Sequence, residues 1–343
     1  MAGESVQVPS VLLERFTALG VDVARVLRLA GLPPSRFQAP RVRLTPQEFF
    51  AFWRAVQAVG GGPELGLRVG AEALPHQFDV ASLAALHSPT LGEGFERMAR
   101  YKRIVCGEQI SIERTEGEAR IQFQWVHVEE ALPLMLVDVT FSALLSLARR
   151  GLGGPLVPRR VELARHEADA ALLRRHFGCP VRFDAPVDLL VLEESALARP
   201  FLTHNADLLA LMLPGLEAQL GEHLTSRSLA DDAKAILGRC MSGARPSVES
   251  LARELRMSRR TLQRRLEEQG TTYQRLLDAV RRDTACRLLH HTGLDPGEIA
   301  FLLGFEELNS FSRAFHAWEG LTPSRWREAR RPRDAAHPLN SEQ

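Results

Sequence analysis

The spacing of apolar residues divides the chain into a mixed N-terminal part and a helical C-terminal part. Residues 9–72 keep the apolar spacing of helices. Within them, Thr45-Pro-Gln-Glu48 has the form of a capping box and predicts a helix through Val59. A similar start at Thr90 predicts a second helix, to about Val105. The chain is therefore expected to open with a helical segment.

The period then changes to the two-residue alternation of β-strands. Residues 109–114 and 119–126 alternate apolar and polar side chains around Glu116-Gly117, which predicts a β-hairpin. The elements expected after it are helices at 133–150, 168–177 and 195–219 and strands at 157–164, 181–183 and 187–192. The fold class expected for the N-terminal region is therefore α+β.

Beyond residue 231 no strand pattern remains, and the spacing is helical to about Arg330. Ser247 and Ser258 occupy N-cap positions of two short helices that are separated by a turn at Arg256-Met257. The inward faces of these helices are expected to hold Val248, Leu251, Ala252, Leu255, Leu262 and Leu266. Two short helices joined in this way form a helix-turn-helix unit.

The second helix of this unit, residues 258–269, keeps a polar outer face. The residues on that face are Ser258, Arg259, Arg260, Gln263 and Arg264. Arginine pairs bidentately with guanine, and glutamine with adenine, in the major groove. We therefore expect this helix to read DNA bases.

A second copy of the unit follows, and it begins at the strong helix start Asp295-Pro-Gly-Glu298. Ile299, Ala300, Leu303 and Phe305 lie 48 positions after Leu251, Ala252, Leu255 and Met257, whereas Phe311 and Phe315 lie 49 positions after Leu262 and Leu266. The second unit therefore has one extra residue near its turn. Its recognition helix, predicted at 307–318, presents Leu308, Asn309, Ser312 and Arg313.

The two units are joined by an amphipathic helix at residues 272–290. At about 1.5 Å per residue this helix is about 28 Å long, which is close to the roughly 34 Å of one DNA turn. Two recognition helices on one face of the protein would then enter successive major grooves. An isolated run of arginines would favour a solvated helix face, but duplicated units at this spacing predict sequence-specific binding of double-stranded DNA.

The paired units resemble the AraC/XylS family of bacterial regulators over about 95 residues, 235–330. The motifs that carry the resemblance are Arg282-xxx-Cys286-xx-Leu289, Glu298-Ile-Ala-xx-Leu-Gly-Phe305, Ser310-Phe-Ser-Arg-Ala-Phe315 and Gly320-Leu-Thr-Pro-Ser-xx-Arg327.

The resemblance implies that Arg260, Gln263 and Arg264 face bases in one groove. It implies that Leu308, Asn309 and Arg313 face the next groove, with a phosphate as the alternative partner of Arg313. Leu308 departs from the polar residues often found there, so it either contacts a thymine methyl or contributes little. In some family members the second unit also touches RNA polymerase, which is therefore a candidate partner.

Residues from about 33 to 213 more loosely resemble the N-terminal domain that is labelled arabinose-binding in regulators of the ornithine-utilisation and VirS types. The matching stretches are Phe78-Asp-Val-Ala-xx-Ala-Ala-Leu86, Ser88-Pro-Thr-Leu-Gly92 and Arg100-Tyr101. The label is not evidence for a sugar. The resemblance implies a small organic effector and a homodimer.

Catalytic spacing is missing from the sequence. Neither HExxH nor GxSxG occurs, and there is no CxxC pair, so we expect no catalytic site, metal or cofactor. Cys106 and Cys179 fit small buried hydrophobes better than sensing thiols. Phe78, Phe95, Tyr101 and Trp125 are candidates for an apolar effector pocket, and ordinary core positions are the alternative.

Composition adds little to this picture. The chain has 343 residues, 45% of them apolar, so two or three domains are expected. No apolar run is long enough for a membrane span, and the N-terminus has no signal-peptide pattern, so a cytoplasmic location is expected. The net charge of +1 is uninformative, but residues 256–265 hold five arginines and no acid.

The expected organisation has four parts. They are an effector and dimerisation domain at 1–221 with a helical segment at 1–72, a flexible linker at 222–231, the DNA-binding domain at 232–330 and a tail at 331–343. The predicted function is an effector-responsive transcription regulator. The alternative is a DNA-binding regulator whose N-terminal domain only dimerises or binds a protein. A catalytic domain fused to a DNA-binding module is disfavoured because no catalytic motif is present.

Overall fold

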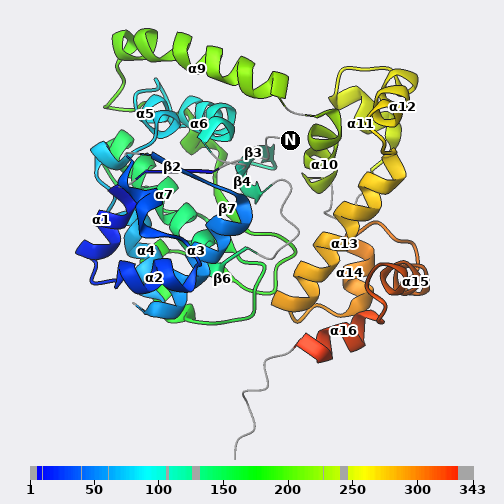
Figure 1. The fold of residues 1–343 in the computed structure, drawn as a ribbon. Helices are drawn as coiled ribbons and strands as arrows, with labels where there is room; N and C mark the ends of the chain where they lie inside the picture. Colours follow the sequence, from blue (N-terminus) through cyan, green and yellow to red (C-terminus); the bar gives the residue numbers. More distant parts are fainter. Residues whose placement is uncertain are drawn as a thin grey trace, which may run out of the picture.

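A computed structural model describes residues 6–9, 11–39, 41–60, 62–105, 108–125, 132–226, 228–239 and 246–330. Figure 1 shows an N-terminal unit of helices and strands beside a helical C-terminal unit. The fold is therefore an α+β domain joined to an all-α domain, which confirms the expected class.

The first part of the N-terminal unit contains short helices and a small antiparallel sheet. The elements are β1 (Val6–Pro9), α1 (Val11–Ala18), α2 (Val23–Leu29), the 3-10 helix η1 (Pro34–Gln38), β2 (Arg41–Leu44), α3 (Pro46–Val59) and α4 (Glu64–Ala71). The capping box of α3 is confirmed, since the Thr45 hydroxyl accepts from the Glu48 amide and the Glu48 carboxylate accepts from the Thr45 amide. The expectation of helix alone over 9–72 was wrong at β2, because four alternating residues are too few to interrupt a helical pattern visibly.

The rest of the N-terminal unit contains the longer helices and the main sheet. The helices are η2 (Pro75–Gln77), α5 (Val80–Leu86), α6 (Leu91–Val105), α7 (Leu134–Leu152), α8 (Ala170–Phe177), η3 (Glu194–Ala198) and α9 (Ala206–Ser226). The sheet has the order β3 (Glu108–Thr115), β4 (Glu118–Trp125), β7 (Leu189–Glu193), β5 (Arg160–Glu162) and β6 (Val181–Arg182). All neighbours in it are antiparallel except β5 and β6.

The β3–β4 hairpin confirms the prediction made from the alternating pattern. Its two turn residues, Glu116 and Gly117, both have positive φ angles, of 52° and 77°. This is the turn that matches the right-handed twist of paired strands. The strand expected at 157–164 is shorter than predicted and is confined to β5.

Helix α7 contributes to two core clusters, to one through Phe141 and Leu145 and to the other through Leu136. Its contact with α4 is close because α4 carries glycine there. A Cβ atom built on Gly70 would lie 2.3 Å from the Val139 carbonyl oxygen of α7. The two helix backbones therefore require a residue without a side chain at this position.

The C-terminal unit is helical throughout its described residues. Its helices are α10 (Leu229–Arg239), α11 (Val248–Glu254), α12 (Arg259–Glu268), α13 (Tyr273–His291), α14 (Pro296–Leu302), α15 (Leu308–Glu319) and α16 (Pro323–Arg330). The predicted N-caps are confirmed, since Ser247, Ser258 and Asp295 each accept from a backbone amide of the helix that follows.

The segment expected as a linker at 222–231 is largely helical. Helix α9 continues through Pro214 to Ser226, and α10 begins at Leu229. A polar stretch such as Gly221-Glu222 has the same composition in an exposed helix end as in a linker, so composition could not separate the two. The predicted tail at 331–343 lies outside the described residues, as does Val126 of the predicted hairpin.

The two units meet at the end of α13. The Gly293 amide donates to Asp184 Oδ1 at 2.7 Å, and His166 Nδ1 lies 3.1 Å from the same oxygen. Arg287 of α13 donates to the Pro186 carbonyl at 3.5 Å. One end of the helix between the two helix-turn-helix units thus rests on a loop of the N-terminal domain.

Candidate nucleic-acid interface and effector cavity

The two helix-turn-helix units have the same turn, residue for residue. Amide 256 bonds to carbonyl 253 and amide 257 to carbonyl 252. In the second unit amide 304 bonds to carbonyl 301 and amide 305 to carbonyl 300, an offset of 48 throughout. The left-handed residue of the turn is Arg256 in the first unit, with φ 53°, and Gly304 in the second, with φ 72°. The duplication read from the sequence is therefore a structural duplication.

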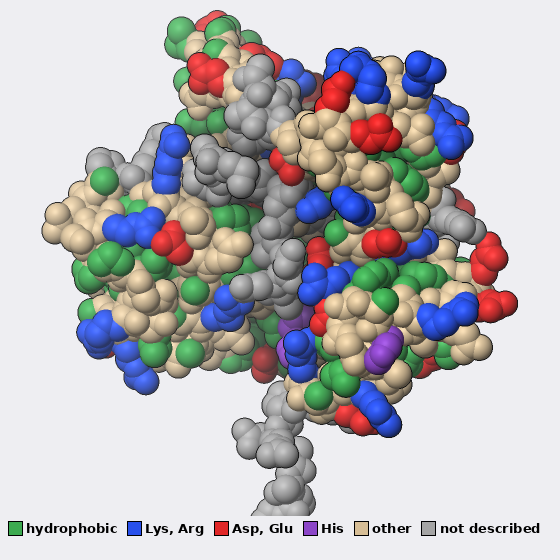
Figure 2. Space-filling view, turned by 45° about the vertical axis from the view of Figure 1, so that its right-hand side comes forward, with side chains coloured by type: hydrophobic (Ala, Val, Ile, Leu, Met, Phe, Trp, Pro, Cys, Tyr) green, Lys and Arg blue, Asp and Glu red, His purple; other side chains and the backbone are tan. Residues whose placement is uncertain are grey.

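Helix α12 buries one face and exposes the other. Leu262 and Leu266 are fully buried, whereas Arg260, Gln263 and Arg264 are exposed. Figure 2 shows Lys and Arg side chains gathered over the upper part of the C-terminal unit, where α11 and α12 lie in Figure 1. The outer face of α12 is therefore basic and open to a large polyanion.

Two of the basic side chains on α12 are held by acids. Arg264 forms an ion pair with Glu268 one turn later, and Arg259 pairs with Glu249 of α11 at 2.7 Å. Ser258 is engaged as the N-cap of α12. In the part of the chain that the structure describes, the Arg260 and Gln263 side chains have no protein partner. These two are thus available for bases without breaking an existing contact.

Helix α15 repeats this arrangement with fewer charges. Phe311 and Phe315 are fully buried, whereas Asn309 and Arg313 are exposed. Leu308 is 46% exposed at the first position of the helix, and Ser312 is half-buried. The structure therefore places the predicted residues of the second unit on one outward face, with an apolar side chain at its start.

Helix α13 holds the second unit in place through contacts of two arginines, of which Arg281 is buried. Arg281 donates to the carbonyls of Leu303 at 2.9 Å and Gly304 at 3.1 Å, and its guanidinium lies 4.4 Å from the centre of the Phe305 ring. Arg282 donates to Glu319 at the end of α15 at 2.6 Å. Planar bidentate contacts of this kind fix orientation as well as distance. The position of α15 is thus set by the helix that joins the units.

A cavity of about 260 Å³ lies inside the N-terminal domain. It is bounded by α7, the end of α6, the β3–β4 hairpin, β1 and α1. Phe78 and Trp125, two of the predicted effector residues, line it. The other two do not. Phe95 and Tyr101 are buried in the core beside it, and the Tyr101 hydroxyl donates to Glu217 of α9.

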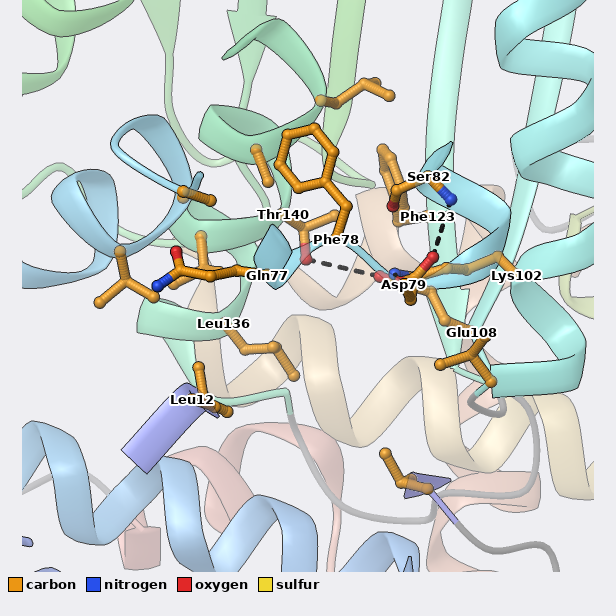
Figure 3. A pocket seen from close by; sticks show the side chains of 18 of the residues that line it. Leu12, Gln77, Phe78, Asp79, Ser82, Lys102, Glu108, Phe123, Leu136 and Thr140 are labelled. Atoms are coloured by element: carbon orange, nitrogen blue, oxygen red, sulfur yellow. Dashed lines mark hydrogen bonds and ion pairs between the residues drawn. The ribbon is translucent and has the colours of Figure 1, made fainter. Parts of the chain in front are cut away.

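One wall of the cavity is polar, and sequence reasoning missed it. Figure 3 shows Asp79, Lys102, Glu108 and Thr140 converging there. Lys102 Nζ lies 2.6 Å from Asp79 Oδ2, and the Ser82 amide donates to Asp79 Oδ1 at 2.8 Å. These groups come from α5, α6, β3 and α7, so no local motif joins them. The one local signal was the helix-capping position of Asp79.

The ionisation of Asp79 follows from these contacts. Burial raises the pKa of the carboxyl, but the Lys102 ammonium and the Ser82 amide outweigh burial, so the pKa of Asp79 lies below its ordinary value. Asp79 and Lys102 therefore form an ion pair at neutral pH. The Thr140 hydroxyl donates to Glu108 Oε1 across 3.4 Å on the same wall.

The described residues were also compared with the requirements of metal sites, membrane spans and reactive thiols. Within them no group of three or more His, Cys, Asp or Glu side chains is arranged to hold a metal, and no helix is both long and apolar enough to cross a membrane. Burial raises the pKa of Cys179 to about 11 and of Cys286 to about 12, which disfavours thiolates. Cys179 is thus a small buried apolar residue, as predicted; Cys106 lies outside the described residues.

Comparison with known proteins identifies both domains. Residues 20–201 match the family described as the arabinose-binding domain of AraC transcription regulator, N-terminal, and residues 251–329 match a helix-turn-helix domain family. These matches fall on the cavity-containing domain and on the paired units.

Two curated relatives span nearly the whole chain. The ornithine utilization regulator of Pseudomonas aeruginosa is 31% identical over 93% of this chain and 94% of its own length. The regulator VirS of Mycobacterium tuberculosis is 28% identical over 90% and 92%. Among solved structures, the transcriptional regulator CdpR from Pseudomonas aeruginosa is 24% identical, with a TM-score of 0.44, over 92% of this chain and 98% of its own.

Proposed function

This chain belongs to the AraC family of DNA-binding transcription regulators, and from that premise we propose that α12 and α15 read successive major grooves of one operator. The observation that carries the proposal is the structural duplication of the two units around α13. Helices that project polar residues from equivalent positions suit repeated reading of one DNA face.

In the first unit, Arg260 and Gln263 are proposed as direct readers of base edges. Both are exposed and neither has a protein partner among the described residues. Arg264 must exchange its ion pair with Glu268 for a base or phosphate. That exposed ion pair is weak in water, so DNA displaces it at little cost. In the second unit Asn309, Arg313, Ser312 and Leu308 take the corresponding roles, with Leu308 against a thymine methyl.

The test compares arginines on the same helix. Arg260→Ala is expected to cost about 1–3 kcal/mol on the preferred operator and to relax discrimination at one or two base pairs. Arg265→Ala, an exposed arginine of α12 outside the predicted reading set, is the matched control and should weaken all sequences about equally. An equal loss on all sequences for Arg260→Ala would show that Arg260 only holds phosphate. Asn309→Ala applies the same measurement to the second unit, where a smaller effect is expected.

The N-terminal domain is proposed to bind a small organic effector in the cavity and to pair with a second copy of the chain. A mostly apolar cavity that is partly open to the surface and has a few convergent polar groups supports the effector. Pairing would place four readers on one operator and raise affinity through effective concentration. Sedimentation of the whole protein, with and without DNA, tests the dimer, and a monomer in both would exclude it.

Control is proposed to run through the contact between the domains. A ligand shifts DNA binding only by its different affinity for two arrangements of the protein. The contact of α13 with Asp184 and Pro186 supplies an arrangement that can be made or broken without rebuilding α12 or α15. Operator DNA must then change effector affinity by the same factor as effector changes operator affinity. If neither affinity responds to the other ligand, the N-terminal domain is passive in DNA binding.

A further inference from the structure

Helix α7 borders the cavity and is also bound to a loop that leads to the domain contact. Six of its residues line the cavity at helical spacing: Leu136, Val139, Thr140, Ala143, Leu144 and Leu147. Asp138, on the same helix, is bound instead by Arg165, which follows β5. Because a helix moves as a rigid element, an occupant that displaces α7 also displaces Asp138.

The ion pair between Asp138 and Arg165 is buried and has two contacts. Arg165 Nη2 donates to Asp138 Oδ1 at 2.8 Å and Nη1 donates to Oδ2 at 3.3 Å, and the two residues are only 8% and 7% exposed. Arg165 also donates to the carbonyl of Leu134, the first residue of α7, at 3.4 Å. Paired contacts of this kind fix orientation as well as distance. The position of Arg165 is therefore set by the start of α7.

The backbone of Arg165 continues this connection to the C-terminal unit. Its carbonyl accepts from the Asp184 amide at 2.9 Å. Asp184 Oδ1 in turn accepts from the Gly293 amide, just beyond α13, at 2.7 Å. A continuous series of hydrogen bonds thus runs from the helix that borders the cavity to the helix that joins the two recognition units.

A second buried carboxylate ties the same loop to α13. Asp188 Oδ1 accepts from the amide of Ala164, the residue before Arg165, at 2.8 Å. Burial raises the pKa of Asp188, whereas the Ala164 amide and the guanidiniums of Arg287 and Arg165 oppose that rise. Arg287 is on α13, so Asp188 attracts one arginine from each domain. The charges in this contact therefore respond to where Arg165 lies.

Another connection leaves the cavity through α6, but it is more exposed. Met98 of α6 lines the cavity, and Arg100 and Tyr101 of the same helix donate to Glu217 of α9. Helix α9 is followed in the chain by α10 of the C-terminal unit. The side chains of Arg100 and Glu217 are 56% and 45% exposed, so water weakens their ion pair. The buried connection through α7 is therefore the stronger of the two.

We propose, on the basis of the effector cavity and the domain contact proposed above, that the Asp138–Arg165 ion pair couples occupancy of the cavity to docking of α13 on the N-terminal domain. An occupant displaces α7, Arg165 follows Asp138, and the loop that receives Gly293 moves with Arg165. Arg165 is thus a positioning residue that touches neither effector nor DNA. The docked and undocked arrangements are the two states whose balance the occupant shifts.

The test fills part of the cavity with a side chain in place of a ligand. Ala143→Leu adds an isopropyl group to the lining, and hydrogen exchange at the Gly293 amide of the whole protein reports docking. Filling is expected to change Gly293 protection at least about twofold, the lower bound for coupling through a packed network. Combining Asp138→Leu with Arg165→Met replaces the buried pair by apolar side chains. In that background Ala143→Leu should leave Gly293 protection unchanged.

Two further variants keep the test decisive if the first ones fail. Folding is judged by circular dichroism. If the paired substitution does not fold or no longer protects Gly293, Arg165→Lys is used instead, since it keeps the charge but loses the two-point contact, and it should reduce the response to filling. If Ala143→Leu does not fold, Ala73→Leu fills the cavity from the residues that follow α4.

The control is Glu217→Gln, which breaks the connection through α9 and should keep the full response of Gly293 to filling. If the response survives loss of the Asp138–Arg165 pair, the inference about that pair is wrong, although control through the domain contact stands. Loss of the response in Glu217→Gln would assign the coupling to α6 and α9. If Gly293 protection responds to neither Ala143→Leu nor Ala73→Leu, the cavity is not coupled to the contact, and the proposed mechanism of control fails as well.

Discussion

At the scale of single residues, the two helix-turn-helix turns adopt the same backbone conformation with different amino acids. The turn needs a left-handed residue, and the second unit supplies Gly304, whereas the first supplies Arg256. A left-handed conformation costs a residue with a side chain roughly 1–2 kcal/mol. The Arg256 side chain is exposed, so no packing depends on it. The first unit therefore carries backbone strain that the second avoids.

Arg256→Gly is expected to stabilise the first unit by about 0.5–1 kcal/mol. Relief of the left-handed strain exceeds the extra backbone entropy that glycine loses on folding. Slower hydrogen exchange of the α11 and α12 amides in the whole protein would report the gain. The reciprocal variant Gly304→Ala should speed exchange in α14 and α15. Equal exchange in Arg256→Gly and the unaltered chain would mean that the left-handed turn carries no strain.

The residues around the proposed effector cavity show where sequence reasoning reaches its limit. Phe78 and Trp125 line the cavity, but Phe95 and Tyr101 have the same aromatic character and lie in the core. An aromatic side chain in an apolar pattern indicates that the residue is buried. It does not indicate whether the residue lines a cavity or packs in the core. The charged pair of Asp79 and Lys102 could not be found by spacing, because Asp79 caps α5 and Lys102 lies on α6, 23 positions away.

At the scale of elements, signals confined to a few neighbouring residues predicted the structure well. The caps at Thr45 and Asp295 and the turn at Glu116-Gly117 were predicted because each satisfies its own hydrogen bonds locally. Strand β2, the end of α9 at Ser226 and the start of α10 at Leu229 were not predicted. A four-residue strand depends on its partner β1, and a polar helix end depends on the helix behind it, so neither has a local signature.

The packing of α4 on α7 leads to a prediction about element spacing. Gly70→Ala should destabilise the protein by roughly 1–3 kcal/mol, because the added methyl meets the backbone of α7 and forces the helices apart. Gly215→Ala on α9 is the matched control, since no atom lies within 4 Å of its added Cβ. That control should instead gain about 0.5–1 kcal/mol from better helix propensity. Urea unfolding of both variants measures the difference. Equal stabilities would show that α4 and α7 can move apart to accept the methyl group without loss of stability.

At the scale of the whole molecule, the contact between the domains brings several titratable groups together. Arg287, His290 and His291 come from α13, with Arg330 of α16 near His290. His166, Asp184 and Asp188 come from the facing loops of the N-terminal domain. No pattern within either domain indicates that these residues face one another, so the sequence alone could not predict this contact.

The histidines at this contact should make domain docking sensitive to acid. Burial, followed by the positive groups of His290, Arg287 and His166, lowers the pKa of His291 to about 4, and burial also lowers the pKa of His290. A histidine exposed to water binds a proton near pH 6.5, and we expect undocking to expose His291 in this way. The docked arrangement therefore binds fewer protons, so docking is strongest above about pH 6.5 and is lost progressively as the pH falls toward about 4.

Hydrogen exchange at Gly293 measures this effect directly, because its amide donates to Asp184 across the contact. Protection at Gly293, corrected for the intrinsic pH dependence of exchange, is expected to fall between about pH 6.5 and pH 5, before the core of either domain opens. His291→Asn should flatten that dependence, since the neutral side chain takes up no proton. His316→Asn, at an exposed histidine of α15, should leave it intact. If His291→Asn retains the full pH dependence, the titrating group lies elsewhere in the contact. If protection in the unaltered chain is independent of pH, docking does not change the number of bound protons. Since operator binding is proposed to differ between the docked and undocked arrangements, operator affinity should change over the same pH range in the unaltered chain and lose that change in His291→Asn.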